Sequence, residues 1–217
     1  MRFEEAEKIG RLLAELPGDI SPVIELGSST TTFRTVQQPH IDRFIHAPLR
    51  ARGVKVVHTD LRDGDGIDVS GDIYEPDVRE RLASLGANTV LCCNIFEHVT
   101  DRSNFASICD EILRPGGFII VSVPYRYPYH LDPIDTMYRP APEELVDLFP
   151  GYEVQVAEPV VGGSFWTDLD RRPVGVLKSV VRVLMLRGGW RESLSRLHRL
   201  TFLFRPYQVS VAVLRKP

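Results

Sequence analysis

The sequence lacks the residues that mark several protein classes. It has three cysteines, Cys92, Cys93 and Cys109, an odd number without the spacing of a metal site. The first two lie in an apolar run, so we expect buried, reduced thiols and a protein of the reducing cytoplasm. No apolar run approaches the roughly 20 residues that span a bilayer. The acidic N-terminus has no apolar signal core, so we expect a soluble protein.

Two nucleotide-binding signatures are also absent. A Walker-type site needs a lysine that the chain does not place after a glycine-rich turn. A dinucleotide-binding dehydrogenase needs a G-x-G-x-x-G turn, which the chain does not contain. No group of His, Cys and carboxylate residues has zinc-ligand spacing, so the sequence predicts no metal site.

The residues that are present are typical of one α/β domain. The chain has 217 residues, of which 43% are hydrophobic and 25% charged. Its net charge of -3 is uneven, because residues 171–217 contain 11 Lys or Arg and one acid, Glu192. We therefore expect a single domain, residues 1–217, with a distinct basic segment near its C-terminus.

Hydrophobic periodicity predicts alternating strands and helices. The expected strands are 21–26, 54–60, 67–73, 89–93, 118–123, 152–157 and 208–214. The expected helices are 4–16, 41–52, 77–85, a helix that ends before Pro115-Gly116-Gly117, and 143–149. This alternation predicts a mostly parallel sheet with helices on both faces. Residues 160–206 form a partly helical insert before the last strand.

Polar residues follow three of the expected strands where each one ends. Glu25 and Gly27 close the first strand, Asp60 the second, and Asn94 the fourth. In an open parallel sheet, ligands lie outside the carboxyl ends of the strands. Glycine lets backbone approach a ligand there, and an acidic residue can hold ribose hydroxyls. The pattern predicts a pocket for a nucleoside cofactor.

Five segments carry a resemblance to a known family. They are Val23-Ile24-Glu25-Leu26-Gly27, Asp60, Gly71-Asp72, Asn94-Ile95-Phe96-Glu97-His98-Val99 and Leu113-Arg114-Pro115-Gly116-Gly117-Phe118. In order and spacing they resemble the class I S-adenosylmethionine-dependent methyltransferases, over residues 20–157 and the last strand. The resemblance implies a Rossmann-like, doubly wound, mostly parallel seven-stranded sheet and S-adenosylmethionine as cofactor.

The resemblance also implies residue roles. Glu25 and Gly27 would border the methionine moiety of the cofactor, and Asp60 would hold the ribose hydroxyls. Asp72 would face the adenine amine, and Asn94 would line the side of the methyl donor.

The turn after Glu25 departs from the family pattern. It reads Gly27-Ser28-Ser29-Thr30-Thr31, so only the first glycine remains. Side chains replace hydrogen where the cofactor presses on backbone, and threonine tolerates positive φ poorly. Two interpretations stay open. In one, hydroxyls such as that of Ser29 hydrogen-bond the cofactor carboxylate. In the other, the site is inactive and the protein is a scaffold that binds a partner through its basic insert.

The segment after the fifth strand, 124–139, resembles one in methyltransferases that cluster with glycan and cell-surface polysaccharide biosynthesis. It implies O-methylation of a saccharide or a related small acceptor. A hydroxyl acceptor needs a base, and His130 is the candidate because its ordinary pKa lies near neutrality. Asp132 or Asp135 would orient it. Alternatively, these residues and Arg139 form a network that fixes the loop.

Further residues near this loop are candidates for acceptor binding. Glu97 and His98 would border the substrate mouth or brace the loop. Tyr125 and Tyr129 would stack on sugar faces or wall the pocket, and Arg139 completes the set.

The basic insert 160–206 has amphipathic helical patterns bordered by arginine. It is interpreted as a lid or a homodimer contact, or as a surface that places the protein peripherally at the inner membrane face. We do not expect nucleic acid as a partner, because aromatic residues are sparse among these basic residues and the rest of the chain is acidic.

Overall fold

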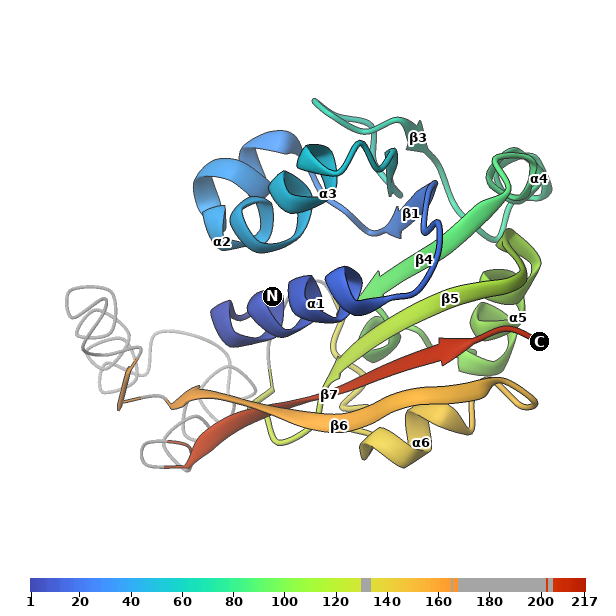
Figure 1. The fold of residues 1–217 in the computed structure, drawn as a ribbon. Coiled ribbons are helices and arrows are strands. Elements are labelled where there is room, and N and C mark those ends of the chain that lie inside the picture. Colours follow the sequence, from blue (N-terminus) through green and yellow to red (C-terminus); the bar gives the residue numbers. More distant parts are fainter. Residues whose placement is uncertain (130–133, 165, 168–201, 203–204) are drawn as a thin grey trace.

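The computed structural model describes residues 1–129, 134–164, 166–167, 202 and 205–217. Their strands form one sheet (Figure 1): β1 Val23–Leu26, β2 Val56–Asp60, β3 Val69–Ser70, β4 Ala87–Cys93, β5 Leu113–Pro124, β6 Glu153–Ser164 and β7 Pro206–Arg215. The α-helices are α1 Phe3–Glu15, α2 Pro39–Ile41, α3 Ala47–Ala51, α4 Pro76–Ser84, α5 Arg102–Ile112 and α6 Pro142–Val146. No helix within these residues has the length and apolar character needed to span a membrane.

The strand order is β3-β2-β1-β4-β5-β7-β6. β1 pairs in parallel with β2 and β4, and β4 pairs in parallel with β5. β7 is antiparallel to both of its neighbours, β5 and β6. The predicted doubly wound, mostly parallel seven-stranded sheet is therefore confirmed. Its topology brings the carboxyl ends of β1, β2 and β4 to one edge.

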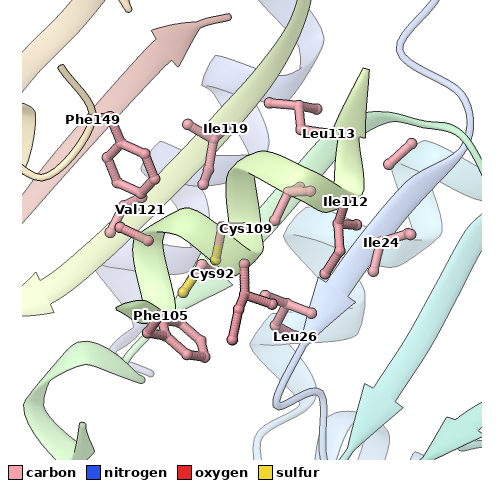
Figure 2. Close-up of a cluster of buried hydrophobic side chains, with 14 of the residues drawn as sticks. Ile24, Leu26, Cys92, Phe105, Cys109, Ile112, Leu113, Ile119, Val121 and Phe149 are labelled. Carbon is pink, nitrogen blue, oxygen red and sulfur yellow. The ribbon is translucent and has the colours of Figure 1, made fainter. Parts of the chain in front are cut away.

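Alternating side chains of the central strands supply two cores. In β5, Phe118 and Ile120 face one side of the sheet, where they join Ile9 and Leu13 of α1. Ile119 and Val121 face the other side, where α5 packs. Figure 2 shows this second core, in which Phe105, Cys109 and Ile112 lie against Ile24, Leu26 and Cys92. Cys92 is a buried free thiol, as expected, and so is Cys109, whereas the free thiol of Cys93 is only partly buried.

Several boundaries differ from the sequence prediction, among them the end of α5 and the extents of β5 and β6. α5 ends at Ile112, because Leu113 already pairs with Ala87 of β4 and opens β5. The Pro115-Gly116-Gly117 turn therefore lies inside β5, where Gly116 has φ +76° and the register with β4 shifts. β6 continues to Ser164 because it pairs with β7 as far as Pro206. The first five residues of the predicted insert thus belong to a strand.

The predicted helix 41–52 is a helical path of three pieces. A π-helical segment, η2 Asp42–His46, lies between α2 and α3. Its wider turn ends when the backbone N–H of Ala47 donates to the carbonyl of Asp42. Pro48 is the second residue of α3, directly after the π-helical turn, and it has no N–H to continue the series of helical hydrogen bonds. The π-helical turn leaves Ile45 and His46 buried.

Candidate functional site

The turn after β1 packs against the end of β2. The backbone N–H of Ser28 donates to the Thr59 carbonyl at 2.8 Å, and that of Ser29 donates to Asp60 Oδ2 at 2.9 Å. Gly27 and Ser29 adopt left-handed conformations, with φ of +64° and +56°. For Ser29 this conformation costs about 1–2 kcal/mol relative to right-handed backbone. The turn keeps its shape without the later glycines, at the expense of strain at Ser29.

Arg34 holds this turn from inside. Its side chain is buried, and its guanidinium donates to Ser28 Oγ at 3.2 Å, to the Gly66 carbonyl at 2.9 Å and to the Ser29 carbonyl. Arg34 thus donates hydrogen bonds to carbonyls of both the turn and the loop after β2, and so links the two segments. Sequence reasoning missed Arg34, although it is the one charged residue in the segment 28–41. A single charged residue in an otherwise uncharged segment could have indicated a buried, paired arginine.

Asp60 is half-buried at the tip of β2, where the sequence predicted the ribose-binding acid. Its Oδ2 accepts the Ser29 N–H, and its Oδ1 accepts the Arg62 N–H at 3.2 Å. Each carboxylate oxygen can accept a second hydrogen bond, so the group can still take hydroxyl donors. Asp72 is exposed beyond β3, and its Oδ1 accepts the Tyr74 N–H at 3.0 Å.

Glu25 is buried under the turn and contacts two histidines. Its Oε2 lies 3.0 Å from His46 Nε2 and 2.8 Å from His58 Nδ1. Burial alone would raise the pKa of Glu25, but the hydrogen bonds and positive charge of the two imidazoles outweigh it and lower the pKa to about 2. The carboxylate is therefore ionised. Sequence reasoning missed both histidines because they come from η2 and β2, far from Glu25 in the chain.

Asn94 anchors α1 to the end of β4. Its φ is +55°, and its Nδ2 donates to Glu5 Oε1 at 2.7 Å. The same oxygen accepts the Ser122 hydroxyl at 2.7 Å, and Glu5 Oε2 accepts the Arg2 N–H at 3.0 Å. Glu5 is buried, so these donors compensate its lost hydration. Asn94 thus has a structural partner that the sequence did not indicate.

Glu97 and His98 contact the segment after the fifth strand. The Glu97 carbonyl accepts the Thr136 N–H at 2.9 Å, and His98 Nδ1 lies 2.6 Å from the Ile134 carbonyl. These contacts tie Glu97 and His98 to residues 134–136. Burial raises the pKa of Glu97 to about 8, and its Oε2 has no hydrogen-bond partner among the described residues. Glu97 is therefore mostly protonated at neutral pH.

Asp135 and Arg139 form a buried ion pair in this segment. Arg139 Nη1 donates to Asp135 Oδ1 at 3.0 Å, and Nη2 contacts the other oxygen. The side chain of Asp135 is completely covered. Tyr125 and Tyr129 are half-buried. His130 and Asp132 lie outside the described residues.

The structure thus groups the predicted residues in two places. Glu25, Gly27, Ser29 and Asp60 meet where β1 and β2 end. Glu97, Asp135 and Arg139 meet through residues 134–139, near the end of β4. Asp72 lies in the turn after β3, the strand at the edge of the sheet, next to Gly71, whose backbone N–H donates to the Asp60 carbonyl at 3.0 Å.

Comparison with known proteins gives one curated relative and many solved structures. The relative is a probable S-adenosylmethionine-dependent methyltransferase from Mycolicibacterium smegmatis, 30% identical over 122 residues. The match covers 52% of this chain and 47% of that protein, so the chain spans about half the length of its relative. No protein-family model matches the chain.

Three solved structures share the fold across nearly the whole chain. A SAM-dependent methyltransferase from Archaeoglobus fulgidus aligns with a TM-score of 0.55 and 16% identity, covering 99% of this chain and 95% of that one. A putative sarcosine dimethylglycine methyltransferase from Galdieria sulphuraria gives 0.54 and 11%, covering 99% and 84%. Coclaurine N-methyltransferase, bound to N-methylheliamine and SAH, gives 0.52 and 14%, covering 97% and 72%. Strand order and these likenesses together give the chain the fold of the class I S-adenosylmethionine-dependent methyltransferases.

Proposed function

We propose that the protein is an S-adenosylmethionine-dependent methyltransferase. The observation that carries the proposal is the Asp60 carboxylate, held by two backbone N–H groups beside the turn at Gly27. The carboxyl edge of such a sheet is where nucleoside ligands bind, and Asp60 keeps acceptor capacity for ribose hydroxyls. The name of the mycobacterial relative supports the same activity.

The chain's residues fit the cofactor in three ways. Gly27 is exposed and has no side chain, so its backbone is open to the methionine end of the ligand. Asp60 accepts hydroxyl hydrogen bonds, and the exposed Asp72 is available to the adenine amine. Bound S-adenosylmethionine supplies an electrophilic methyl group, and the protein's main task is to align the acceptor with it. The carboxylate of Glu25 contacts His46 and His58, so Glu25 supports the turn at Gly27 from below.

For the acceptor we propose an oxygen of a saccharide or a related small molecule. Tyr125 and Tyr129 are half-buried after the end of β5, where aromatic faces can stack on sugar rings. Asp135 is committed to Arg139, so it serves as a positioning residue that holds this segment. The base is assigned to His130, with Asp132 as its partner. His130→Ala should abolish methyl transfer and leave SAH binding unchanged, whereas retained transfer would remove His130 from this role.

For the basic segment that includes 168–201 we propose a lid or a homodimer contact first. The alternative is peripheral contact with an anionic membrane, since the segment is rich in arginine. Gel filtration with light scattering measures the oligomeric state, and co-sedimentation with anionic and neutral vesicles measures membrane contact.

Isothermal titration calorimetry with S-adenosylmethionine and SAH tests the proposed activity at its first step. We expect micromolar binding, weakened about 10- to 100-fold in Asp60→Ala, because hydrogen bonds to a charged group are lost. Asp60→Asn keeps an acceptor for the Ser29 N–H and separates ligand contact from damage to the turn. Asp63→Ala, the same change at an exposed neighbour, is the matched control. Absence of heat with folded wild-type protein would contradict the proposal and favour the scaffold interpretation.

A further inference from the structure

Three side chains of the types that ligate metal ions converge beneath the turn. They are Glu25 of β1, His46 of η2 and His58 of β2, and each offers one ligand atom. The three atoms all lie within 4.8 Å of one another. The two imidazole rings meet edge to face, with centroids 4.9 Å apart. Among the described residues this is the one such cluster of three or more potential ligands. We propose that Glu25, His46 and His58 bind a divalent transition-metal ion, with Zn²⁺ as the ion to test.

The distances suit an ion with little rearrangement. Zinc binds imidazole nitrogen and carboxylate oxygen at about 2.0–2.2 Å, so tetrahedral ligand atoms lie about 3.3 Å apart. Here Glu25 Oε2 lies 3.0 Å from His46 Nε2 and 2.8 Å from His58 Nδ1. For these two pairs, separations only a few tenths of an ångström larger would admit the ion. In the neutral tautomers that leave His46 Nε2 and His58 Nδ1 without a proton, the lone pairs of these two atoms would face the ion.

The three side chains are buried or half-buried and come from three different elements, as expected of a specific binding site. Glu25 and His46 are 6% and 2% exposed, and His58 is half-buried. Burying an anion with two imidazoles costs free energy unless they are paired, and a bound cation would satisfy all three groups. His46 is the last residue of the π-helical segment η2, and its side chain is buried there. π-Helical turns occur frequently at functional sites.

A cavity of about 300 Å³ adjoins the cluster, and both histidines line it. The charged groups that line it with them are Arg34, Asp42, Arg50 and Asp68. Arg50 pairs with Asp42 at 2.8 Å, and Arg34 is occupied by the carbonyls of the turn. When both imidazoles are neutral, as metal ligands must be, these side chains and Glu25 carry three negative and two positive charges, a balance that favours a cation. The cavity leaves room for water or a small ligand at a fourth coordination position.

An ion at this place would join β1, η2 and β2 directly under the turn at Gly27. It would fix the position of Glu25 whether or not the neighbouring edge binds S-adenosylmethionine. The proposal therefore does not depend on the proposed methyltransferase activity, and it is tested without that cofactor.

The test measures Zn²⁺ binding to the full chain after removal of metals with a chelator. Calorimetry with ZnCl₂ and elemental analysis after dialysis should both give one ion per chain. His58→Gln and His46→Ala should weaken binding at least about 100-fold, because each removes one of three protein ligands. His40→Ala is the matched control, since His40 contacts the Met1 carbonyl and lies outside the cluster. Circular dichroism establishes that each variant is folded.

Wild-type protein that binds no stoichiometric Zn²⁺, or folded His46 and His58 variants that bind as wild type does, would overturn the proposal. A second measurement applies if the variants do not fold. Wild-type protein loaded with Co²⁺ should show tetrahedral d–d bands without thiolate charge-transfer absorption. Thiolate absorption would assign the ion to cysteines instead.

Discussion

Glu97 gives the sharpest prediction about pH. Its side chain is buried, one carboxyl oxygen has no partner among the described residues, and its pKa is raised from 4.5 to about 8. Between these values the folded protein holds a proton that the unfolded chain has released. Stability conferred by this proton is therefore largest at low pH and is lost as the pH rises toward 8. From about pH 6 to about pH 7.5 the loss amounts to about 2 kcal/mol.

Glu97→Gln removes the titration and keeps the shape of the side chain. We expect the free energy of unfolding of wild type to fall by about 2 kcal/mol more than that of the variant over this interval. Urea denaturation followed by circular dichroism at both pH values measures the difference. Wild type and variant share every other titratable group, so the difference between them reports Glu97. Glu15→Gln, the same change at an exposed site, should parallel wild type. Parallel curves for Glu97→Gln would refute the reasoning.

Two further predictions concern the turn after β1. Ser29→Gly should stabilise the protein by about 1 kcal/mol. Glycine relieves the strain of the left-handed backbone at φ +56°, but part of this gain is lost because glycine raises the conformational entropy of the unfolded chain. Ser29→Ala, which keeps the strain, should show no such gain in thermal denaturation. Arg34→Met should destabilise by about 3 kcal/mol, because the buried Ser28 and the partly buried Ser29 carbonyl lose their donor. Arg50→Met, at an exposed ion pair, should cost under about 1 kcal/mol, and equal losses would contradict the role given to Arg34.

The sequence was most informative where one strand or helix carries the signal. Periodicity predicted the seven strands and the two-sided sheet, because alternation along each strand reports which face is buried. It failed at element ends. The start of β5 at Leu113 depends on pairing with Ala87, and the end of β6 at Ser164 depends on pairing with β7. Such long-range hydrogen bonds leave no local pattern.

The candidate site divides in the same way. Asp60 and Gly27 were predictable because each stands at the end of an apolar run, and parallel strands bring such ends to one edge. The hydrogen-bond partners of the site residues could not be predicted from the sequence. Arg34 reaches the turn through a buried guanidinium, and Glu5 reaches Asn94 from a helix 89 residues away.

The sequence by itself thus determined the order of elements and the edge at which polar residues gather, because local hydrophobic patterns and strand ends suffice for both. Only the tertiary structure decided which groups touch. Glu25, read in the sequence as a cofactor contact, is buried against His46 and His58, since folding brings η2 and β2 over the end of β1. The physical reason is that side-chain contacts depend on three-dimensional packing between distant segments, and hydrophobic periodicity carries no information about it.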